Sequence, residues 1–351
     1  MRVTPHIAAI GTAVPTHDIH AAFVDWAERR LPVREARVFA RMAARAGIAH
    51  RWSVLPAERG SPVGSNGFYA AEPHPGTGAR MALYAQAAPT LALAAIADLR
   101  TQAALDGITH LVVASCTGFV APGIDQIVAR ALELPGSVER VLIGFMGCYA
   151  AVAALRTARH IVRSEPAARV LVVTVELSTL HLQSERALEP LLAMLQFGDG
   201  AAAALVCASH AGLAIDRPFS ATLPAAAELI RWDITDHGFA MHLSGEVPGR
   251  ITGALRDPAL VATLTDGRGV DRWAVHAGGR SILDAVEHAL ALPAAALDDS
   301  RAVLAANGNM SSATLMFVLA RVLAGPPVEH GIALAFGPGL AAEGLAFASA
   351  A

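Results

Sequence analysis

The sequence predicts an α/β protein made of two similar halves, and two observations indicate this fold. Short runs of β-branched residues alternate with longer alanine-rich segments of helical periodicity along the 351 residues. A strand, a glycine-rich turn and a helix also follow one another in the same order in both parts of the chain. Because 54% of the residues are hydrophobic and only 16% are charged, the composition fits an ordered globular protein with a large core.

The first half, which we place at residues 1–208, starts with a short strand and a turn. Segment 59–75 is rich in Gly, Ser and Pro, which indicates a surface loop. We expect strands at 109–115, 141–145, 169–176 and 201–207, and helices at 78–99, 124–132 and 149–162.

The second half, residues 209–351, repeats this order. Cys116 and Cys148 are 32 residues apart, and His276 and Asn309 are 33 apart. Two similar halves would place these residues at their junction, whereas chance similarity between alanine-rich helices is the alternative. We expect strands at 272–276 and 331–336, and helices at 281–291 and 311–323.

The composition excludes several kinds of chemistry. The chain has no lysine, since all 27 basic residues are arginine, so a Schiff base, pyridoxal phosphate attachment and a phosphate-loop lysine are excluded. The net charge is −3 and no basic stripe is present, so a role in nucleic-acid binding has little support. The three cysteines form neither a disulfide framework nor the spacing of a zinc site, and we expect no metal.

The N-terminus and the apolar runs indicate the cellular compartment of the protein. The first 15 residues lack the apolar core and cleavage site of a signal peptide. The apolar runs are interrupted by Arg, His or Gly, so we expect no membrane span. A reducing, cytoplasmic compartment is therefore predicted.

Three residues suggest the chemistry of acyl transfer. Cys148 stands between a strand and a helix, where the helix N-terminus favours a thiolate, although a buried core thiol is the alternative. His276 ends an apolar strand before two glycines, and it can equally be a structural histidine. Asn309 has the position of an ordinary helix N-cap, but an amide beside an imidazole can stabilise an enolate or oxyanion. Together, the three suit acyl transfer followed by carbon–carbon bond formation.

The motifs around these residues resemble those of the type III polyketide synthases, the chalcone-synthase-like group of the thiolase superfamily. The resemblance covers nearly the whole chain, in the family's order. Its motifs are GFMGCYA, VHAGGRSILDAVE and NGNMSSA, together with CTGFVAPGID, VELSTLHLQ, FGDGAAA, GEVPG and FGPGL.

The resemblance implies a five-layer αβαβα thiolase-like fold, a homodimer, and coenzyme A thioesters as substrates with no cofactor. Cys148 would accept the starter from acyl-CoA and carry the growing chain. His276 would keep Cys148 ionised and, with Asn309, stabilise the enolate formed when malonyl-CoA loses carbon dioxide. Phe197 matches a gatekeeper between the coenzyme A tunnel and the reaction cavity.

The sequence departs from plant members of the family at several positions. The second gatekeeper is Met241 in place of phenylalanine, and its flexible thioether fills space less rigidly. At the position of Gly245, plant members carry a lysine that is directed at coenzyme A. Phosphate contacts would therefore come from arginines here, and Arg41, Arg45 and Arg51 lie where the family places basic residues. A solvated helix face is the alternative for them.

Small residues at cavity positions suggest the substrate. Cys116, Thr117, Ala121 and Ser178 match a wall that carries larger side chains in plant enzymes, so a medium- or long-chain fatty acyl starter is predicted, with an alkylpyrone or alkylresorcinol-type product. Bacterial members with short starters share some of these residues, which is the alternative. A single-condensation β-ketoacyl carrier-protein synthase III-like enzyme and an acyl-CoA thioesterase are the rival functions.

Overall fold

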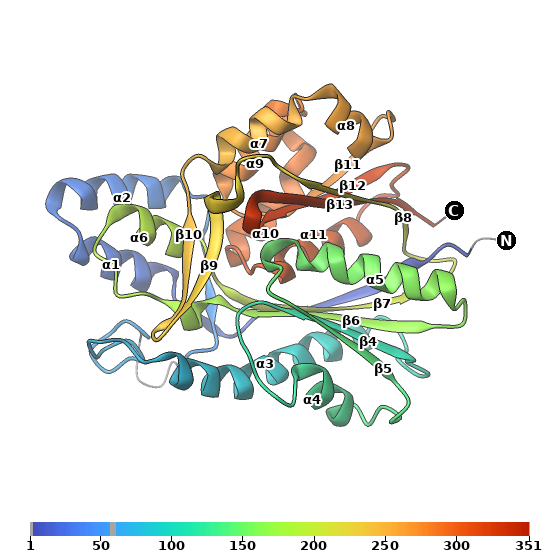
Figure 1. Cartoon of the computed structure of the whole chain (residues 1–351), viewed down its shortest axis with the longest axis horizontal. Helices are drawn as coiled ribbons and strands as arrows, with labels where there is room; N and C mark the ends of the chain where they lie inside the picture. Colours follow the sequence, from blue (N-terminus) through green and yellow to red (C-terminus); the bar gives the residue numbers. More distant parts are fainter. Residues whose placement is uncertain (1–2, 57–60, 351) are drawn as a thin grey trace.

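The computed structural model describes residues 3–56 and 61–350. Figure 1 shows an elongated molecule in which sheets and helices alternate in layers. Residues 61–75 contain no helix or strand, as expected for the surface loop, while residues 59 and 60 of that prediction lie outside the described residues.

Nine strands form one continuous sheet in the order β11-β12-β13-β8-β1-β7-β6-β4-β5. The order β1-β7-β6-β4 of the first half recurs as β8-β13-β12-β11 in the second, with the same parallel and antiparallel pairings. β1 and β8 pair antiparallel and join the two halves. These strands are β1 (His6–Ala13), β4 (His110–Ser115), β5 (Glu139–Gly144), β6 (Arg169–Leu177), β7 (Asp199–Cys207), β8 (Leu213–Thr222), β11 (Arg272–Val275), β12 (Gly331–Gly337) and β13 (Ala341–Ser349).

The helices cover and separate the two parts of the sheet, which confirms the five-layer thiolase-like arrangement. In Figure 1, α3 and α4 lie below the first part, α5 and α11 lie between the two parts, and α7, α8 and α9 lie above the second. The helices are α1 (His20–Arg30), α2 (Val33–Arg45), α3 (Thr77–Arg100), α4 (Ile124–Ala131), α5 (Ala150–Ser164), α6 (Leu188–Met194), α7 (Val247–Leu255), α8 (Pro258–Thr265), α9 (Arg280–Ala289), α10 (Asp298–Asn307) and α11 (Ser312–Leu323).

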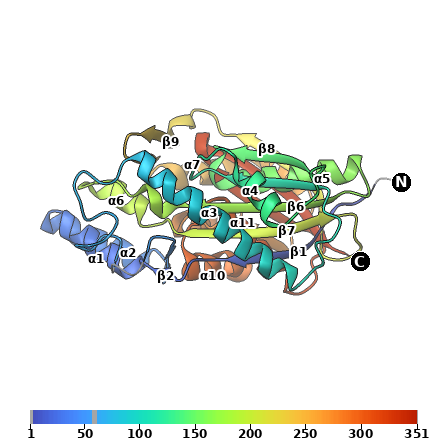
Figure 2. The same cartoon turned by 90° about the horizontal axis from the view of Figure 1, so that it is seen from below.

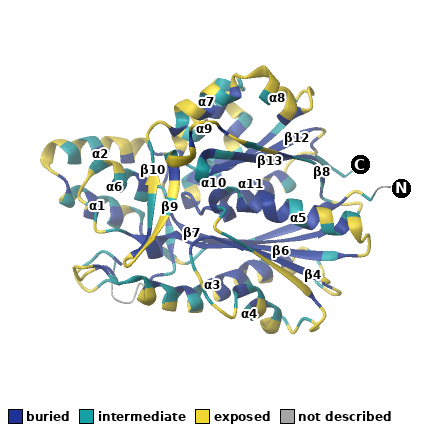
Figure 3. Cartoon of the chain, viewed as in Figure 1, coloured by how far each residue is buried: buried dark blue, intermediate teal, exposed yellow. Residues whose placement is uncertain are grey.

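Burial follows this layering and explains why the strand and helix predictions were accurate. Every residue of β7, and all of β6 except Arg169, is buried, because helices cover both faces, so these strands are continuous apolar runs. The middle helices α5 and α11 are mostly buried, whereas α2 and α8 are largely exposed (Figure 3). Within the described residues, α3 is the one helix long and apolar enough to cross a membrane, but Tyr84, Ala92 and Leu99 of α3 lie in the hydrophobic core.

The two ends of the molecule differ. Figures 1 and 2 show α1, α2 and α6 at one end and both chain termini at the other. A hairpin of β9 (Ile230–Thr235) and β10 (Gly238–Leu243) stands toward the helical end in Figure 1. Figure 2 shows β2 (His17–Asp18), which pairs with β3 (Trp52–Ser53), near α2. The domain boundary that we place after residue 208 falls in the connection between β7 and β8.

Candidate active site

Cys148 lies in a tight turn between β5 and α5. A single 3₁₀ turn, Gly147–Tyr149, leads directly into the first residue of α5, so the thiol stands at a helix N-terminus as predicted. Gly147 has φ +63°, and a Cβ there would lie 2.5 Å from Cδ of Pro338, so glycine is required for both reasons. The turn therefore holds Cys148 against the FGPG segment of the second half.

His276 and Asn309 come from the second half. His276 follows β11, and its backbone N–H donates to the carbonyl of Leu334 over 2.8 Å. Asn309 Nδ2 donates to the carbonyl of Gly278 over 3.1 Å, and its Oδ1 accepts from the backbone N–H of Ser311 over 2.8 Å. The amide of Asn309 is thus fixed to the loop that carries His276.

One pocket is lined by all three predicted catalytic residues. Cys148, His276 and Asn309 share it with Phe197 and Met241, the two predicted gatekeepers. Neither ring nitrogen of His276 has a hydrogen-bond partner among the described residues, so both are free to interact with a substrate. The structure therefore brings together five residues that are spread over more than 160 positions of the sequence.

Burial determines the protonation states in this pocket. Cys148 is 6% exposed, and burial raises the pKa of its thiol to about 12, although hydrogen bonds with Ser311 and Asn309 lower it. Burial also lowers the pKa of His276 to about 3. Desolvation therefore acts against the helix N-terminus at Cys148, and ionisation of its thiol by His276 stays a prediction.

A buried polar cluster next to Cys148 was not predicted. Glu176 accepts hydrogen bonds from the backbone N–H of Cys116, from the hydroxyl of Thr117 over 2.8 Å and from Ser312. The thiol of Cys116 also lies 3.3 Å from the hydroxyl of Ser311, which in turn hydrogen-bonds to Cys148. The NMSSA motif contained the signal for this cluster, since two adjacent serines in an apolar segment need buried partners.

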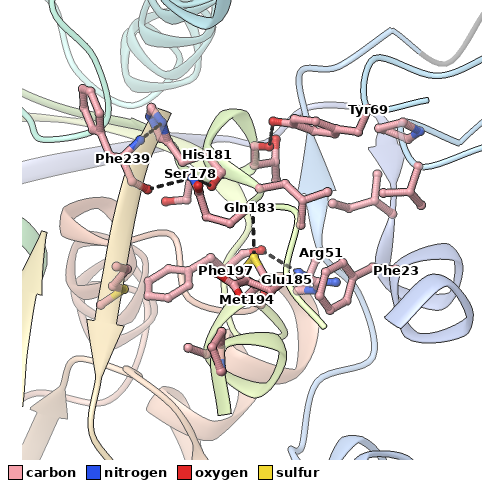
Figure 4. A pocket seen from close by; sticks show the side chains of 18 of the residues that line it. Phe23, Arg51, Tyr69, Ser178, His181, Gln183, Glu185, Met194, Phe197 and Phe239 are labelled. Carbon is pink, nitrogen blue, oxygen red and sulfur yellow. Dashed lines mark hydrogen bonds between the residues drawn. The ribbon is translucent and has the colours of Figure 1, made fainter. Parts of the chain in front are cut away.

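A second pocket lies beyond the gatekeepers. Ala193, Phe197 and Met241 line both pockets, so they form the boundary between them. The second pocket is mainly apolar, and Figure 4 shows it with Phe23 and Arg51 on one side and Phe239 and His181 on the other. Its apolar lining comes from Ile19, Phe23, Leu55, Pro62, Val63, Leu182, Pro190, Met194 and Phe239.

The four small residues of the predicted acyl wall have different surroundings in the single chain, although Thr117 Oγ1 accepts from the backbone N–H of Leu177, the residue before Ser178, over 2.8 Å. Ser178 lines the second pocket, and its hydroxyl has no partner among the described residues. Cys116 and Thr117 line neither pocket, because their side chains are hydrogen-bonded to Glu176. Ala121 is exposed on the loop before α4. Within this single chain, Ser178 is the one of the four that lines either pocket, so the prediction of one wall stays a prediction.

The arginines proposed for coenzyme A have different surroundings. Arg41 and Arg45 are exposed on α2, and Met42 between them lines the first pocket, as does Gly245. Arg51 is only 1% exposed, and its Nη1 donates to the carbonyls of Met194 and Phe197. The prediction of a phosphate contact by Arg51 is wrong, because its guanidinium holds the gatekeeper segment in place.

Comparison with known proteins agrees with this geometry. The N-terminal domain of chalcone and stilbene synthases matches residues 3–210, and the C-terminal domain of the same family matches residues 215–351. The chain is 34% identical over 287 residues to the alpha-pyrone synthesis polyketide synthase-like Pks18 of Mycobacterium tuberculosis strain H37Rv, which covers 76% of this chain and 72% of that protein. Pks18 of Mycobacterium bovis matches equally well.

Solved structures match over nearly the full length. The crystal structure of PKS-I from the brown alga Ectocarpus siliculosus has a TM-score of 0.89 and 29% identity and covers 99% of both chains. The C-terminal type III polyketide synthase domain of Steely1 from Dictyostelium, at 24% identity and a TM-score of 0.91, covers 99% of this chain and 100% of that one and supports the fold. Since both family domains match and a relative is 34% identical, this chain belongs to the chalcone and stilbene synthase family, the type III polyketide synthases, and is an acyltransferase.

Proposed function

We propose that the protein loads a medium- or long-chain fatty acyl group from coenzyme A onto Cys148 and extends it with malonyl-CoA. The extended chain then closes to an alkylpyrone or alkylresorcinol-type product. The observation that carries the proposal is the shared pocket of Cys148, His276 and Asn309, which has Phe197 and Met241 in common with a second, apolar pocket.

In the proposed loading step, Cys148 and His276 react from their neutral forms in the pocket that both line. His276 accepts the proton of the Cys148 thiol as the sulfur attacks the starter thioester, and the proton then leaves with the coenzyme A thiol. A free ring nitrogen is required for this step, and both nitrogens of His276 are without partners among the described residues. Proton transfer within the pair also avoids leaving one isolated charge in a buried pocket.

The extension step needs stabilisation of an enolate. When the malonyl group loses carbon dioxide, negative charge moves onto the thioester oxygen, and His276 and the Asn309 amide are the donors proposed to stabilise it. The resulting carbon nucleophile attacks the acyl group on Cys148, forms the new carbon–carbon bond and releases the Cys148 sulfur. No cofactor is required, because decarboxylation supplies the driving force.

The starter class follows from the second pocket. Its lining is mostly aliphatic and aromatic, so an alkyl tail gains roughly 0.8 kcal/mol for each methylene that it buries there. The name of the Mycobacterium relative, an alpha-pyrone synthesis polyketide synthase-like protein, supports a pyrone as the product. Arg41 and Arg45 beside the pocket are the proposed contacts for coenzyme A phosphates.

A homodimer in the cytoplasm is part of the proposal. β5 is an edge strand of the nine-stranded sheet, and large apolar side chains are exposed along it and on neighbouring loops. A second copy that pairs along this edge would cover Phe119, Val141, Leu142 and Phe145. Leu142→Asp should shift the protein from dimer to monomer in analytical ultracentrifugation, whereas a monomeric wild type would contradict the proposal.

Product analysis tests the function directly. Purified enzyme is incubated with malonyl-CoA and acyl-CoA starters of 2 to about 16 carbons, and the products are identified by mass spectrometry. We expect products that contain at least two malonyl-derived units, made most efficiently from long starters. A single condensation would favour the carrier-protein synthase type of enzyme, and free fatty acid without use of malonyl-CoA would indicate a thioesterase.

A further inference from the structure

Trp232 contacts Phe197 and Met241, two of the residues that form the boundary between the two pockets. It lies in β9 opposite Met241 of β10, with which it forms a cross-strand pair. Its ring also packs at 49° to that of Phe197, with 6.2 Å between the ring centroids. One side chain of the hairpin is therefore next to both gatekeepers and lines the second pocket.

The indole nitrogen of Trp232 is buried without a hydrogen-bond acceptor among the described residues. By contrast, Nε1 of Trp52 donates to the carbonyl of Ala306 over 3.0 Å. A Cβ on Gly147 would lie 3.7 Å from Nε1 of Trp232, so the free donor is close to the residue that immediately precedes Cys148. A buried donor next to the nucleophile and beside a substrate pocket indicates an acceptor that arrives with the substrate.

The chemistry of the acyl group carried by Cys148 limits which atom of the substrate can be the hydrogen-bond acceptor for Trp232. A fatty acyl starter carries one carbonyl, the thioester that must face His276 and Asn309, and its alkyl tail has no acceptor. Each condensation adds a keto group two carbons beyond the thioester. That keto oxygen is the first acceptor able to reach the gatekeepers Phe197 and Met241 while the thioester stays at the catalytic residues.

We propose that the indole N–H of Trp232 donates to the keto oxygen of the extended chain and so acts as a substrate-positioning residue that distinguishes an extended chain from a starter. The proposal rests on the function proposed above. Trp232 makes and breaks no covalent bond, and Cys148 still exchanges one thioester for another with release of the coenzyme A thiol. The hydrogen bond favours retention of the first condensation product for a second extension.

The test removes the N–H and keeps the ring. Trp232 is replaced site-specifically by benzothienylalanine, which has sulfur in place of the N–H, and separately by Trp232→Phe. Ile234→Ala is the matched control, because Ile234 lies on the same strand and is 64% exposed. The assays use decanoyl-CoA and malonyl-CoA and measure starter loading on Cys148, malonyl decarboxylation, and the ratio of products with two extensions to products with one.

We expect the ratio to fall about tenfold in both Trp232 variants, as the loss of one buried hydrogen bond implies. Loading and decarboxylation should stay at the wild-type level with benzothienylalanine, which keeps the bicyclic ring that lines the second pocket. Ile234→Ala should keep the wild-type ratio. An unchanged ratio with benzothienylalanine would overturn the proposal, and so would an equal loss of loading, which would indicate a structural role. A wild type that makes no malonyl-dependent product would contradict the proposed function itself.

Discussion

The two halves of the molecule place different residues at equivalent positions. In the first half, β4 leads through Cys116 to α4, and in the second half, β11 leads through His276 to α9. Cys116 is enclosed by Glu176 and Ser311, whereas His276 has two ring nitrogens without partners among the described residues. The same strand-to-helix turn thus carries a structural residue in one half and a proposed catalytic residue in the other.

The turns before the two middle helices both carry a proposed catalytic residue. Cys148 precedes α5 in the first half, and Asn309 precedes α11 in the second. The first half therefore contributes the proposed nucleophile, and the second half contributes His276 and Asn309, to a pocket that neither half could form alone. The comparison teaches that symmetry fixes where the side chains stand, while hydrogen-bond partners distinguish Cys116, which is enclosed, from His276, whose ring nitrogens have no partner among the described residues.

The largest effect should come from comparing the two cysteines near the pocket. Cys148→Ala removes the proposed nucleophile, and we expect at least about a 10⁴-fold loss of product formation. Cys116→Ala removes only a thiol that hydrogen-bonds to Glu176, so activity should fall by no more than about tenfold, with a stability loss near 1–2 kcal/mol. Steady-state product assays and urea unfolding measure these effects, and polyketide formation by Cys148→Ala would refute the assignment.

Substitution of Asn309 should affect malonyl decarboxylation and leave starter loading intact. Because its amide is proposed to stabilise the enolate and not the thiol exchange, Asn309→Ala should lower malonyl decarboxylation by about 10²–10³-fold. A radiolabelled starter should still load onto the protein. Asn307→Ala serves as a control, since Asn307 lies two residues away and bonds to the carbonyl of Val303. An equal decrease in loading and decarboxylation for Asn309→Ala would contradict this division of roles.

The pKa of His276 predicts an acid-dependent loss of stability. Its folded-state pKa is lowered to about 3, whereas the unfolded value is 6.5, so the unfolded state binds the proton first and stability falls as the pH drops below 6.5. At pH 4.5, the loss relative to pH 7 should amount to about 2–3 kcal/mol from this residue. His276→Gln should lack that part of the decrease.

Urea unfolding at pH 7 and pH 4.5 measures this contribution. His242→Gln is the control, because it makes the same substitution at an exposed histidine of β10. The same pH dependence in His276→Gln and the wild type would mean that His276 is not held neutral by burial.

The sequence predicted much of this fold and of the catalytic pocket for identifiable physical reasons. Strands such as β6 are covered on both faces, so their continuous apolar runs are visible without a structure. Cys148, His276 and Asn309 lie at strand ends or helix starts, where a motif fixes their position. Helix α2 was considered only as the alternative helix face for Arg41 and Arg45, although its apolar residues recur with helical periodicity. The hairpin that carries Trp232 and Met241 was not predicted as paired strands, because its segments are partly exposed and mixed in composition.

Predictions failed where the three-dimensional environment reverses a local expectation. Arg51 belongs to an arginine-rich segment that suggests a phosphate site, yet its side chain turns inward to the carbonyls behind Phe197. The ionisation of Cys148 was argued from a helix start and from His276, whereas burial raises the pKa of its thiol. Neither effect can be deduced from residues that are adjacent in sequence.

The smallest expected effect concerns the acyl wall. Ser178 lines the second pocket and Ala121 does not, so Ser178→Met should fill space next to an alkyl tail while Ala121→Met should not do so within one chain. For Ser178→Met, we expect the ratio of kcat/KM for decanoyl-CoA over acetyl-CoA to fall by about tenfold, the equivalent of one or two methylenes that are no longer buried.

The same ratio for Ala121→Met decides where residue 121 acts. An unchanged ratio agrees with its exposed position in the single chain. A decrease as large as that for Ser178→Met would mean that the loop before α4 reaches the pocket of a partner subunit, so the acyl wall would be completed only in the dimer. If Ser178→Met lowers kcat/KM for both starters equally, the second pocket does not hold the starter tail, and short or aryl starters become the better candidates.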